Sequence, residues 1–477
     1  MTATWMETTG SVLHDRVALI AAYNGEAVAV EGPQATLRYR DLTTLADSWA
    51  GRLTAPVGSV VALRIVDPTY LAPAFLAVRA AGLVPMLIDP HAPGARTASV
   101  LSAAKPTLMM DVQETPFIDI ASREPRIVRP DAGYLGFTSG TQGPPKGIVA
   151  REQGVAHFVD WEIATLGIRP SDRVAMISPP SFEVIFRELF ATLCAGARIV
   201  VADAMTRTNP AAMLPWLAKH TIDIVHAVPG LAARWASASP GTRLERLRWT
   251  LFAGEPLHSV QIESWQACAP NSRIGNLYGP SETTLAKFFY PVPDSPHPGL
   301  QPVGRPLPWA RLRQIGAEDD VFQVGIETPD ASFGYLPGTA SEADEAAFTH
   351  AEESVLFRSQ DLGALDQDGN LVIKGRLDSR VKRRGVFVDL GAIEESANRL
   401  PGVRAAGCVQ TGPAAGGAIV LCAETDVPVS SLRKALLGSL GPNSPDRVVA
   451  LPVLPLSPNG KIDRRSLRAL LEAEAER

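Results

Sequence analysis

Apolar and polar positions alternate in short blocks over the first 290 residues, and these blocks predict strands and helices in turn. Runs rich in β-branched residues, separated by helix-like stretches, are typical of buried strands. They fall at residues 57–65, 83–88, 173–178, 198–202, 223–228 and 249–253. A helix is expected over residues 70–81, with a turn at Gly82 before the next strand. Because strands that alternate with helices build parallel sheets, residues 20–290 predict two helix-covered, mainly parallel sheets.

The pattern changes after residue 291, where prolines and glycines become frequent and the expected strands become short. Asp368-Gly369 is typical of a hairpin turn, and residues 291–372 predict a small distorted β-barrel. Farther along, helices are expected at 391–398, at 429–440 and at the C-terminus, and strands at 405–410 and 418–424. We therefore expect an α/β protein with a large N-terminal domain (1–377) joined by a hinge to a small α+β C-terminal domain (378–477).

Composition limits the classes of partner. The 477 residues are 46% apolar and 20% charged, and the net charge of −5 favours neither nucleic acid nor an anionic membrane as partner. Pro73, Arg79 and Pro85 interrupt the longest apolar run and argue against a membrane span. The four cysteines form no C-x-x-C pair, which favours reduced thiols. The N-terminus lacks the features of a signal peptide, so a soluble, cytoplasmic protein is expected.

Residues 134–147 combine small, hydroxylated and basic side chains in a pattern suited to a polyanion. Glycine lets a backbone approach a phosphate closely, hydroxyls add donors, and a lysine adds a mobile positive charge. The candidate phosphate contacts are Thr138, Ser139, Gly140, Thr141, Gly143 and Lys146. The stretch is not a Walker loop, because it contains no G-x-x-x-x-G-K-[ST]. An ordinary surface loop is the alternative interpretation.

The same stretch resembles the phosphate loop of the adenylate-forming superfamily, which includes peptide-synthetase adenylation domains, acyl- and aryl-CoA ligases and luciferases. The usual run is [ST]SG[ST]TGxPKG, and Gln142 replaces its second threonine. The resemblance implies ATP as a cosubstrate and a catalytic contribution from Thr138. Residues 252–257 and 303–307 are also similar to segments of amino-acid adenylation domains, which implies that Gly254 lies at the ATP site.

A second signature, residues 276–284, matches the family's YGPTE motif apart from serine in place of threonine. The resemblance implies that Tyr278 packs on the adenine next to Gly279, that Asn276 contacts the base, and that Glu282 binds Mg²⁺. An aromatic face can stack on a purine, and a carboxylate is a ligand that Mg²⁺ prefers. A solvated carboxylate in a turn is the alternative interpretation of Glu282.

A third signature, residues 357–363, resembles the family's YRTGDLG. The resemblance implies that Asp361 accepts hydrogen bonds from both ribose hydroxyls, as a carboxylate with two oxygens can. Gln360 replaces a glycine of that pattern and leaves the local backbone conformation open.

Residues 375–385 match the family's GRxDxxVKxRG. The resemblance implies that Arg376 contacts the nucleotide, that Asp378 is the hinge between the domains, and that Gly385 lines the channel for the thiol. A basic, solvated hairpin is the alternative interpretation.

The last signature, residues 454–465, is close to the family's LPxTxxGKxDR. The resemblance implies that Lys461 lies between the substrate carboxylate and the α-phosphate. Attack of a carboxylate on phosphorus brings two anionic groups together, so a lysine there would stabilise the developing charge.

Residues 179–190 align with the FDxSxxEIF segment of peptide-synthetase adenylation domains, in which an aspartate binds the α-amino group of the substrate. Glu183 takes the place of that aspartate. Its extra methylene moves the charge by about 1.5 Å, which favours a smaller substrate or one with its amine elsewhere, such as a β-amino acid. The alignment implies a pocket formed by Glu183, Val184, Arg187, His226, Leu251, Ala253, Leu277, Leu285 and Ala286.

Arg187 is unusual for a specificity pocket and has two interpretations. It could clamp a second carboxylate on the substrate, or it could pair with Glu183, four residues earlier on one helix, and leave a pocket for an uncharged acid. His226 is either a substrate ligand or a packed core residue.

The leading hypothesis is a free-standing enzyme that activates an amino acid and passes it to the phosphopantetheine thiol of a separate carrier protein, in natural-product or antibiotic biosynthesis. Residues 390–394 and 459–465 resemble the peptide-synthetase branch more than the CoA-ligase branch. The alternatives are an acyl- or aryl-CoA ligase and a degenerate, non-catalytic binding protein, the latter suggested by Gln142, Gln360 and Glu183.

Overall fold

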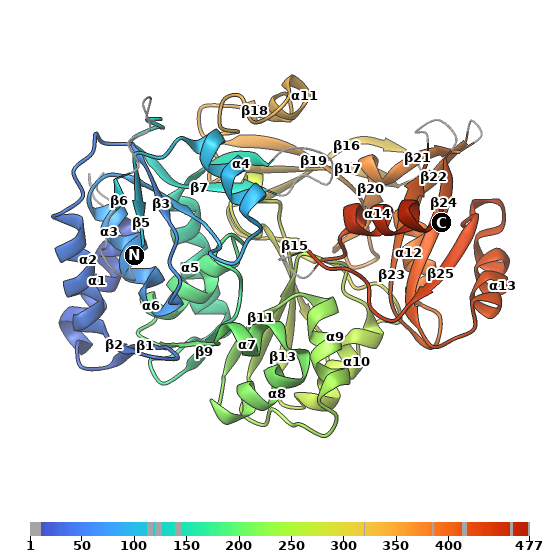
Figure 1. Ribbon diagram of the computed structural model, residues 1–477, viewed down its shortest axis with the longest axis horizontal. Helices are drawn as coiled ribbons and strands as arrows, with labels where there is room; N and C mark the ends of the chain where they lie inside the picture. The colour runs from blue at the N-terminus through green and yellow to red at the C-terminus, as the bar shows by residue number, and fades with distance from the viewer. Residues whose placement is uncertain are drawn as a thin grey trace.

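The computed structural model describes residues 11–111, 118–119, 126–138, 145–318, 320–383, 386–412, 417–457 and 461–475 (Figure 1). A large N-terminal domain fills the left and centre of the view, and a small C-terminal domain lies on the right. No helix within the described residues is long and apolar enough to cross a membrane.

The centre of the large domain is a nine-stranded sheet in the order β15-β14-β13-β12-β11-β9-β10-β1-β2. Along this order the strands from β13 to β1 are parallel, and antiparallel strands lie at both edges. The strands are β1 (Val28–Glu31), β2 (Thr36–Arg38), β9 (Arg173–Met176), β10 (Arg198–Val201), β11 (Ile224–Ala227), β12 (Trp249–Ala253), β13 (Arg273–Tyr278), β14 (Phe288–Val292) and β15 (Arg305–Pro306).

Helices cover both faces of this sheet, because both faces are apolar. Val174 and Leu251 lie in one core with α1, α2, α3 and α5, whereas their neighbours Ala175 and Phe252 lie in a second core with α8, α9 and α10. Successive side chains point to opposite faces of a strand, so adjacent residues bury on opposite sides. The helices of the large domain are α1 (Val12–Asn24), α2 (Tyr39–Ala50), α3 (Leu71–Ala80), α4 (Gly94–Ala104), α5 (Glu152–Leu166), α6 (Thr192–Cys194), α7 (Ala204–Thr208), α8 (Pro210–Lys219), α9 (Pro229–Ala238), α10 (Ser259–Cys268) and α11 (Glu342–Glu345).

A second sheet has the order β4-β3-β5-β6, and a separate hairpin pairs β7 with β8. The expected turn between α3 and β4 is confirmed at Gly82, whose φ of +71° is one that favours glycine. The hairpin matters for the site, because its register sets Thr138 opposite Lys146. The strands are β3 (Val60–Leu63), β4 (Val84–Leu87), β5 (Leu108–Met110), β6 (Ile118–Asp119), β7 (Ala132–Thr138) and β8 (Lys146–Arg151).

Five antiparallel strands form the third unit of the large domain, in the order β16-β17-β19-β18 with β20 paired to β19. The expected hairpin turn joins β19 to β20, with Gly369 at φ +77°. The same hairpin sets Asp361 directly opposite Arg376. The strands are β16 (Arg311–Glu318), β17 (Val321–Thr328), β18 (Phe348–His350), β19 (Val355–Leu365) and β20 (Leu371–Arg376).

The C-terminal domain is built on a three-stranded sheet, β23-β24-β25, with helices on both faces. Helices α12 and α13 share one core, and α14 closes the other. The hairpin β21–β22 leads into this domain, and the sequence predicted neither β22 nor β25. The elements are β21 (Arg380–Arg383), β22 (Val386–Asp389), α12 (Leu390–Asn398), β23 (Val403–Thr411), β24 (Ala418–Thr425), α13 (Val429–Leu440), β25 (Arg447–Leu451) and α14 (Arg464–Ala475).

Candidate active site

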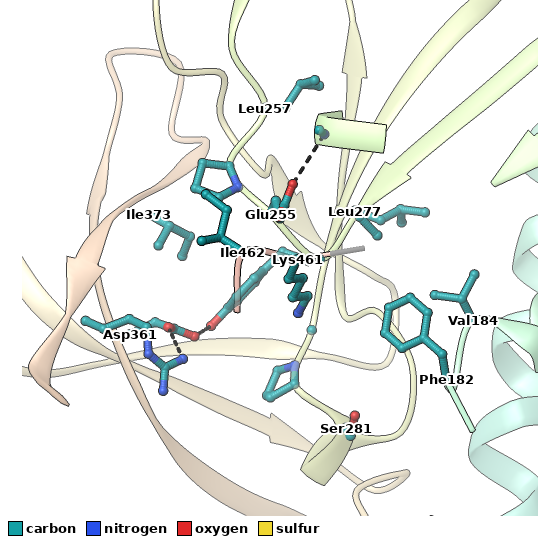
Figure 2. Close-up of a pocket in the computed structure, with 18 of the residues that line it drawn as sticks. Phe182, Val184, Glu255, Leu257, Leu277, Ser281, Asp361, Ile373, Lys461 and Ile462 are labelled. Carbon is teal, nitrogen blue, oxygen red and sulfur yellow. Dashed lines mark hydrogen bonds and ion pairs between the residues drawn. The ribbon is translucent and has the colours of Figure 1, made fainter. Parts of the chain in front are cut away.

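A cavity of about 1450 Å³ lies where the two domains meet, and both contribute to its lining. Figure 2 shows one part of it, with Lys461 pointing into the space between Asp361 on one side and Phe182 on the other. Most of the residues that the sequence assigned to a site line this cavity. They are Thr138, Lys146, Glu183, Val184, Arg187, Ala253, Gly254, Asn276, Leu277, Tyr278, Gly279, Glu282, Leu285, Ala286, Asp361, Arg376, Asp378 and Lys461. Ser139, Gly140, Thr141, Gly143 and Gly385 lie outside the described residues.

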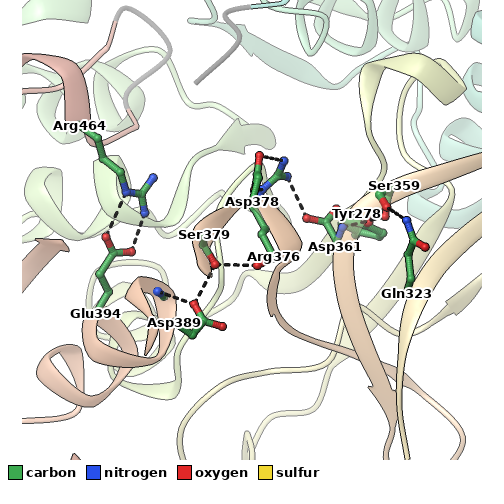
Figure 3. Close-up of polar contacts among 11 residues, drawn as sticks. Tyr278, Gln323, Ser359, Asp361, Arg376, Asp378, Ser379, Asp389, Glu394 and Arg464 are labelled. Carbon is green, nitrogen blue, oxygen red and sulfur yellow. Dashed lines mark hydrogen bonds and ion pairs between the residues drawn. The ribbon is translucent and has the colours of Figure 1, made fainter. Parts of the chain in front are cut away.

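One end of the cavity carries a chain of charged and aromatic side chains (Figure 3). The Tyr278 hydroxyl donates to Asp361 at 2.5 Å, and Arg376 donates to the other oxygen of Asp361 at 2.9 Å. Arg376 also holds both oxygens of Asp378, at 2.8 and 3.0 Å. Burial, together with the Asp361 charge, raises the pKa of Tyr278 well above its usual range. The aromatic ring, the carboxylate and the Asp378 segment are therefore fixed relative to one another before any ligand binds.

Asn276 and Gly279 also line the cavity, and the surrounding protein constrains each of them in a different way. The Asn276 amide donates to the Pro302 carbonyl at 2.8 Å, so its orientation is set by the protein. A side chain at Gly279 would meet the Leu285 carbonyl at 2.5 Å, closer than a Cβ can approach. Glycine is required there because two backbone segments pass against each other.

Lys461 enters the cavity from the C-terminal domain. The Ser457 amide donates to the Lys461 carbonyl at 2.7 Å, and Leu456 pairs with Ile462, so the segment carrying the lysine is a closed loop. The Lys461 Cε lies 3.3 Å from the position of a Cβ at Gly254, whose φ is +90°. Any larger residue at Gly254 would crowd the lysine and strain the backbone.

Glu255 is the acidic neighbour of this lysine and was not singled out by the sequence. Burial raises the pKa of Glu255, and the charge of Lys461 opposes that rise. Burial likewise lowers the pKa of Lys461, and Glu255 opposes that change. The Gly230 amide at the start of α9 donates to Glu255 at 3.3 Å, which ties the pair to the large domain.

The β7–β8 hairpin, through Thr138 and Lys146, and Glu282 also line the cavity. Lys146 pairs with Asp344 at 2.5 Å, and Tyr335 donates to one oxygen of Glu282 at 2.7 Å. Within the described residues, no group of three or more His, Cys, Asp or Glu side chains is arranged to hold a metal ion. A cation near Glu282 would therefore take its remaining ligands from a bound molecule.

Glu183 is a half-buried carboxylate that also lines the cavity. The Tyr134 hydroxyl and the Leu285 amide donate to it, and burial raises its pKa to about 7. Thr284 and Leu285 have φ values of +61° and +57°, in the left-handed region that β-branched and bulky residues rarely adopt. The Lys287 ammonium donates to the Thr284 carbonyl and holds this bend in place. Strain of this kind is typical of functional sites.

Arg187 does not pair with Glu183, contrary to one of the two interpretations. Glu183 lies in the turn before a short π-helical segment (Arg187–Ala191), so the expected spacing of one regular helix does not apply. Arg187 instead donates to Glu162 of α5 at 3.1 and 3.2 Å, and His226 contacts the same carboxylate oxygen at 3.0 Å. Burial opposes ionisation of Glu162, yet the charge of Arg187 lowers the pKa of Glu162 below its usual value. The Arg187 guanidinium is therefore already paired with a carboxylate of the protein.

His226 and Leu251 are buried behind the pocket wall and are not among the described residues that line the cavity. Burial, with the nearby Arg187 charge, lowers the pKa of His226. The structure thus supports the packed-core interpretation of His226. The remaining apolar residues, Val184, Ala253, Leu277, Leu285 and Ala286, line the cavity as expected.

The sequence profile of the AMP-binding enzyme family matches residues 14–325. The chain belongs to this family. That result confirms the resemblance of its motifs to the adenylate-forming superfamily. The chain is 28% identical over 503 residues to phenyloxazoline synthase MbtB of Mycobacterium sp. (strain MCS), covering 98% of this chain and 42% of the relative. It is 28% identical over 518 residues to enterobactin synthase component F of Escherichia coli (strain K12), covering 98% and 40%. The AMP-binding enzyme thus spans about two fifths of the length of these curated relatives.

Solved structures confirm the expected fold class of this AMP-binding enzyme. The crystal structure of IdnL7 superposes with a TM-score of 0.81 at 24% identity, covering 97% of this chain and 99% of that one. Klebsiella oxytoca NpsA in complex with 3-hydroxyanthranilyl-AMSN gives 0.81 at 21% identity, covering 96% and 99%. The anthranilate CoA ligase AuaEII in complex with anthranoyl-AMP also gives 0.81, at 17% identity, covering 98% of each chain. At these identities the similarity concerns the fold, and it does not distinguish between acceptors of the acyl group.

Sequence reasoning missed the partners that hold the predicted residues of the AMP-binding enzyme. Glu255 could have been found, because it lies inside a quoted motif next to Gly254. Glu162 gave a weaker signal, a lone acid on the apolar side of α5. Tyr335, which holds Glu282, stands in an irregular segment with no motif, and only the fold brings it to the site.

Proposed function

We propose that this AMP-binding enzyme activates an amino acid as acyl-AMP and then transfers it to the phosphopantetheine thiol of a separate carrier protein in natural-product biosynthesis. One observation carries the proposal. A single cavity is lined by the half-buried carboxylate Glu183, by the Asp361–Arg376 pair and by Lys461, which points into the space between Asp361 and Phe182. Such a cavity suits a substrate with an ammonium group at one end and a nucleotide at the other.

The role that we assign to each residue follows from the charges that develop during the two half-reactions. In the first half-reaction a carboxylate oxygen of the acid attacks the α-phosphorus of ATP, the bond to the β-phosphate breaks, and pyrophosphate leaves. Lys461 stabilises the negative charge that gathers where the two anions meet. Thr138 and Lys146 bind the phosphates, and Asp361 binds the ribose. In the second half-reaction the thiol sulfur attacks the acyl carbon, loses its proton to solvent, and AMP leaves with the oxygen of the acid.

The domain boundary belongs to the same proposal. We take residues 1–377 and 378–477 as the two moving parts, with Asp378 as the hinge. Arg376 holds both oxygens of Asp378, and the neighbouring Ser379 donates to Asp389 at 2.8 Å (Figure 3). A rotation at this point would break a specific set of bonds, as expected of a hinge that has discrete positions.

The residues present fit Mg²⁺ at Glu282. Mg²⁺ is usually held by one or two carboxylates together with phosphate oxygens of the substrate and water. Glu282 lines the cavity, and the Tyr335 hydroxyl donates to one of its two carboxylate oxygens. The ion would neutralise part of the charge on the phosphates.

Glu282→Gln should lower the rate of adenylate formation chiefly by weakening Mg²⁺ binding, because a neutral amide is a poor ligand for a hard cation. Titration of the rate with Mg²⁺ should then show the half-saturating concentration raised about tenfold or more, with part of the rate recovered at high Mg²⁺. Tyr335→Phe is the matched control, since it removes the hydrogen bond to Glu282 and keeps the carboxylate. A Glu282→Gln protein with native Mg²⁺ dependence would remove Glu282 from the metal site.

The contacts of Arg187 and Glu183 support one class of acid substrate within this proposal. Arg187 is bound to Glu162, so it is not available to clamp a second carboxylate. Glu183 has the Tyr134 hydroxyl and the Leu285 amide as hydrogen-bond partners, and the Lys287 charge also acts on it. An ammonium on the substrate would pair with the Glu183 carboxylate, whereas a second acidic group would find Arg187 already bound to Glu162. We therefore favour an α- or β-amino acid with an uncharged side chain.

The pH dependence of kcat/KM should report the ionisation of Glu183. The pKa of Glu183 is raised to about 7 by burial, against the Tyr134 and Leu285 hydrogen bonds and the Lys287 charge, while Glu282 adds to the rise. An ammonium binds the ionised form, so kcat/KM should rise as pH increases through about 7. Below that pH it should fall about tenfold per unit, because kcat/KM follows the free enzyme. Glu183→Gln should flatten this limb. A native profile that is flat from pH 5.5 to 8 would contradict the role.

An ATP–pyrophosphate exchange screen across α-amino, β-amino and aryl acids tests the proposed function. We expect exchange to depend on an amino acid with an uncharged side chain. Exchange with non-amino acids instead, followed by acyl-CoA formation, would replace the proposal with an acyl- or aryl-CoA ligase. No exchange with any acid would favour the degenerate binding protein.

A further inference from the structure

We propose that Arg234 and Glu424 are positioning residues that lock the C-terminal domain in the orientation that inserts Lys461 into the cavity. The inference rests on the proposed function for its activity assay. The contact between Arg234 and Glu424 lies within the described residues, and one of its tests can be done without knowing the acid substrate.

Glu424 lies at the end of β24 and is a buried acid that receives bonds from both domains. Arg234, on α9 of the large domain, donates to Glu424 Oε2 at 2.9 Å. The Leu454 amide of the C-terminal domain donates to the same oxygen at 3.3 Å, and Arg404 approaches the other oxygen at 3.6 Å. Glu424 is 7% exposed, so an ion pair here is stronger than one on an open surface.

The same arginine also holds the backbone that leads to Lys461. Arg234 donates to the Leu454 carbonyl at 3.4 Å as well as to Glu424. Leu454 is buried in a core with Leu467 of α14, and the closed loop that follows it carries Lys461. Arg234 therefore contacts the C-terminal domain at the base of the loop that carries the lysine.

Helix α9 connects this contact to the cavity. Gly230 and Arg234 are four residues apart and so lie on one side of the helix. The Gly230 amide binds Glu255, whose charge acts on Lys461, and Arg234 binds Glu424 one turn later. One turn of one helix thus holds both the loop base and the carboxylate facing the lysine. Breaking the Arg234–Glu424 pair should release the domain and leave the Glu255 and Lys461 side chains themselves unaltered, although the Arg234 charge also acts on Glu255.

Arg234→Glu places two carboxylates together and should lower the rate of ATP–pyrophosphate exchange about tenfold, within the usual range for coupling between two conformational states. Thioester formation from preformed acyl-adenylate should change less than about twofold, because Lys461 has no part in it. Arg404→Ala is the matched control. It removes a partner of the same Glu424 from within the C-terminal domain and should leave both half-reactions near native. Equal losses in the two half-reactions, or none in either, would overturn the proposal.

A distance measurement separates this inference from the proposed function. Spin labels at Met205→Cys and Leu437→Cys report on the two domains, since these side chains are 75% and 61% exposed, and a Cys194→Ser background removes the one native thiol that is not buried. With ATP present, the native protein should populate the distance found in the structure, and Arg234→Glu should deplete that population. If Arg234→Glu leaves the distance distribution unchanged, the proposed role of the Arg234–Glu424 pair is wrong, even if the native protein shows strong ATP–pyrophosphate exchange. Absence of exchange in the native protein with the distance shift present would instead overturn the proposed function.

Discussion

Lys461→Ala should reduce acyl-adenylate formation by roughly 100- to 1000-fold. Lys461 points into the cavity between Asp361 and Phe182, and its removal would leave the substrate carboxylate and the α-phosphate to meet without charge compensation. Removal of a single group that stabilises transition-state charge costs about 3–4 kcal/mol. The measurement is ATP–pyrophosphate exchange with a saturating acid, compared with thioester formation from preformed adenylate. The second half-reaction should stay close to native, because the proposed rotation about Asp378 would take Lys461 out of the site before the thiol enters.

Lys434→Ala is a suitable control, because Lys434 is an exposed lysine on α13 of the same domain. It should leave both half-reactions unchanged. If Lys461→Ala lowers the two half-reactions to the same degree while the protein stays folded, the alternation of the C-terminal domain is wrong. If it lowers neither, Lys461 is not the catalytic lysine.

Glu183→Gln should lower kcat/KM for the amino-acid substrate by roughly 30- to 1000-fold. The change removes a charge-assisted hydrogen bond and leaves the ammonium unpaired in a poorly solvated pocket, a loss on the order of 2–4 kcal/mol. Deaminated analogues should be poor substrates of the native enzyme and should gain relative to the amino acid in the variant. Steady-state kinetics with the amino acid and its deaminated analogue measures this change in substrate preference.

Tyr134→Phe provides the comparison, because it removes the hydroxyl that donates to Glu183 and keeps the carboxylate. Its effect should be smaller than that of Glu183→Gln, and it should not change the preference for the amine. An equal fall for the amino acid and its deaminated analogue in Glu183→Gln would show that Glu183 supports the pocket and does not bind the amine.

Local sequence patterns predicted the elements whose burial is regular. Strand β12 and helix α13 have the expected limits, because residues 249–252 are a continuous buried run and the helix from Val429 to Leu440 turns one apolar side to its core. Strand β25 was missed, since Arg447–Leu451 mixes exposed and buried positions and acquires its extended form by pairing with β24. Pairing between distant segments leaves little trace in the residues of either segment.

The candidate site likewise has a part that the sequence predicted and a part that it did not. Motifs identified Asp361, Arg376, Glu282 and Lys461 because each stands in a run of characteristic neighbours, and the structure brings all four to one cavity. They could not reveal what each residue is bound to. The sequence offered Glu183 or a substrate carboxylate as the partner of Arg187, but the actual partner is Glu162, 25 positions earlier on α5. That ion pair results from packing α5 against the π-helical segment, and no local spacing encodes it.

Transfer of a heavy-oxygen label tests the proposed adenylation most directly. An acid found active in the exchange screen, labelled in both carboxylate oxygens, is incubated with ATP, Mg²⁺ and a thiol acceptor, and the AMP and pyrophosphate are analysed by mass spectrometry. Attack of the carboxylate on the α-phosphorus predicts one labelled oxygen in each AMP formed and none in pyrophosphate. Label in inorganic phosphate with formation of ADP would mean an acyl-phosphate intermediate, and unlabelled AMP would mean that water attacks the phosphorus. Either result would contradict the proposed activation of an acid as its adenylate.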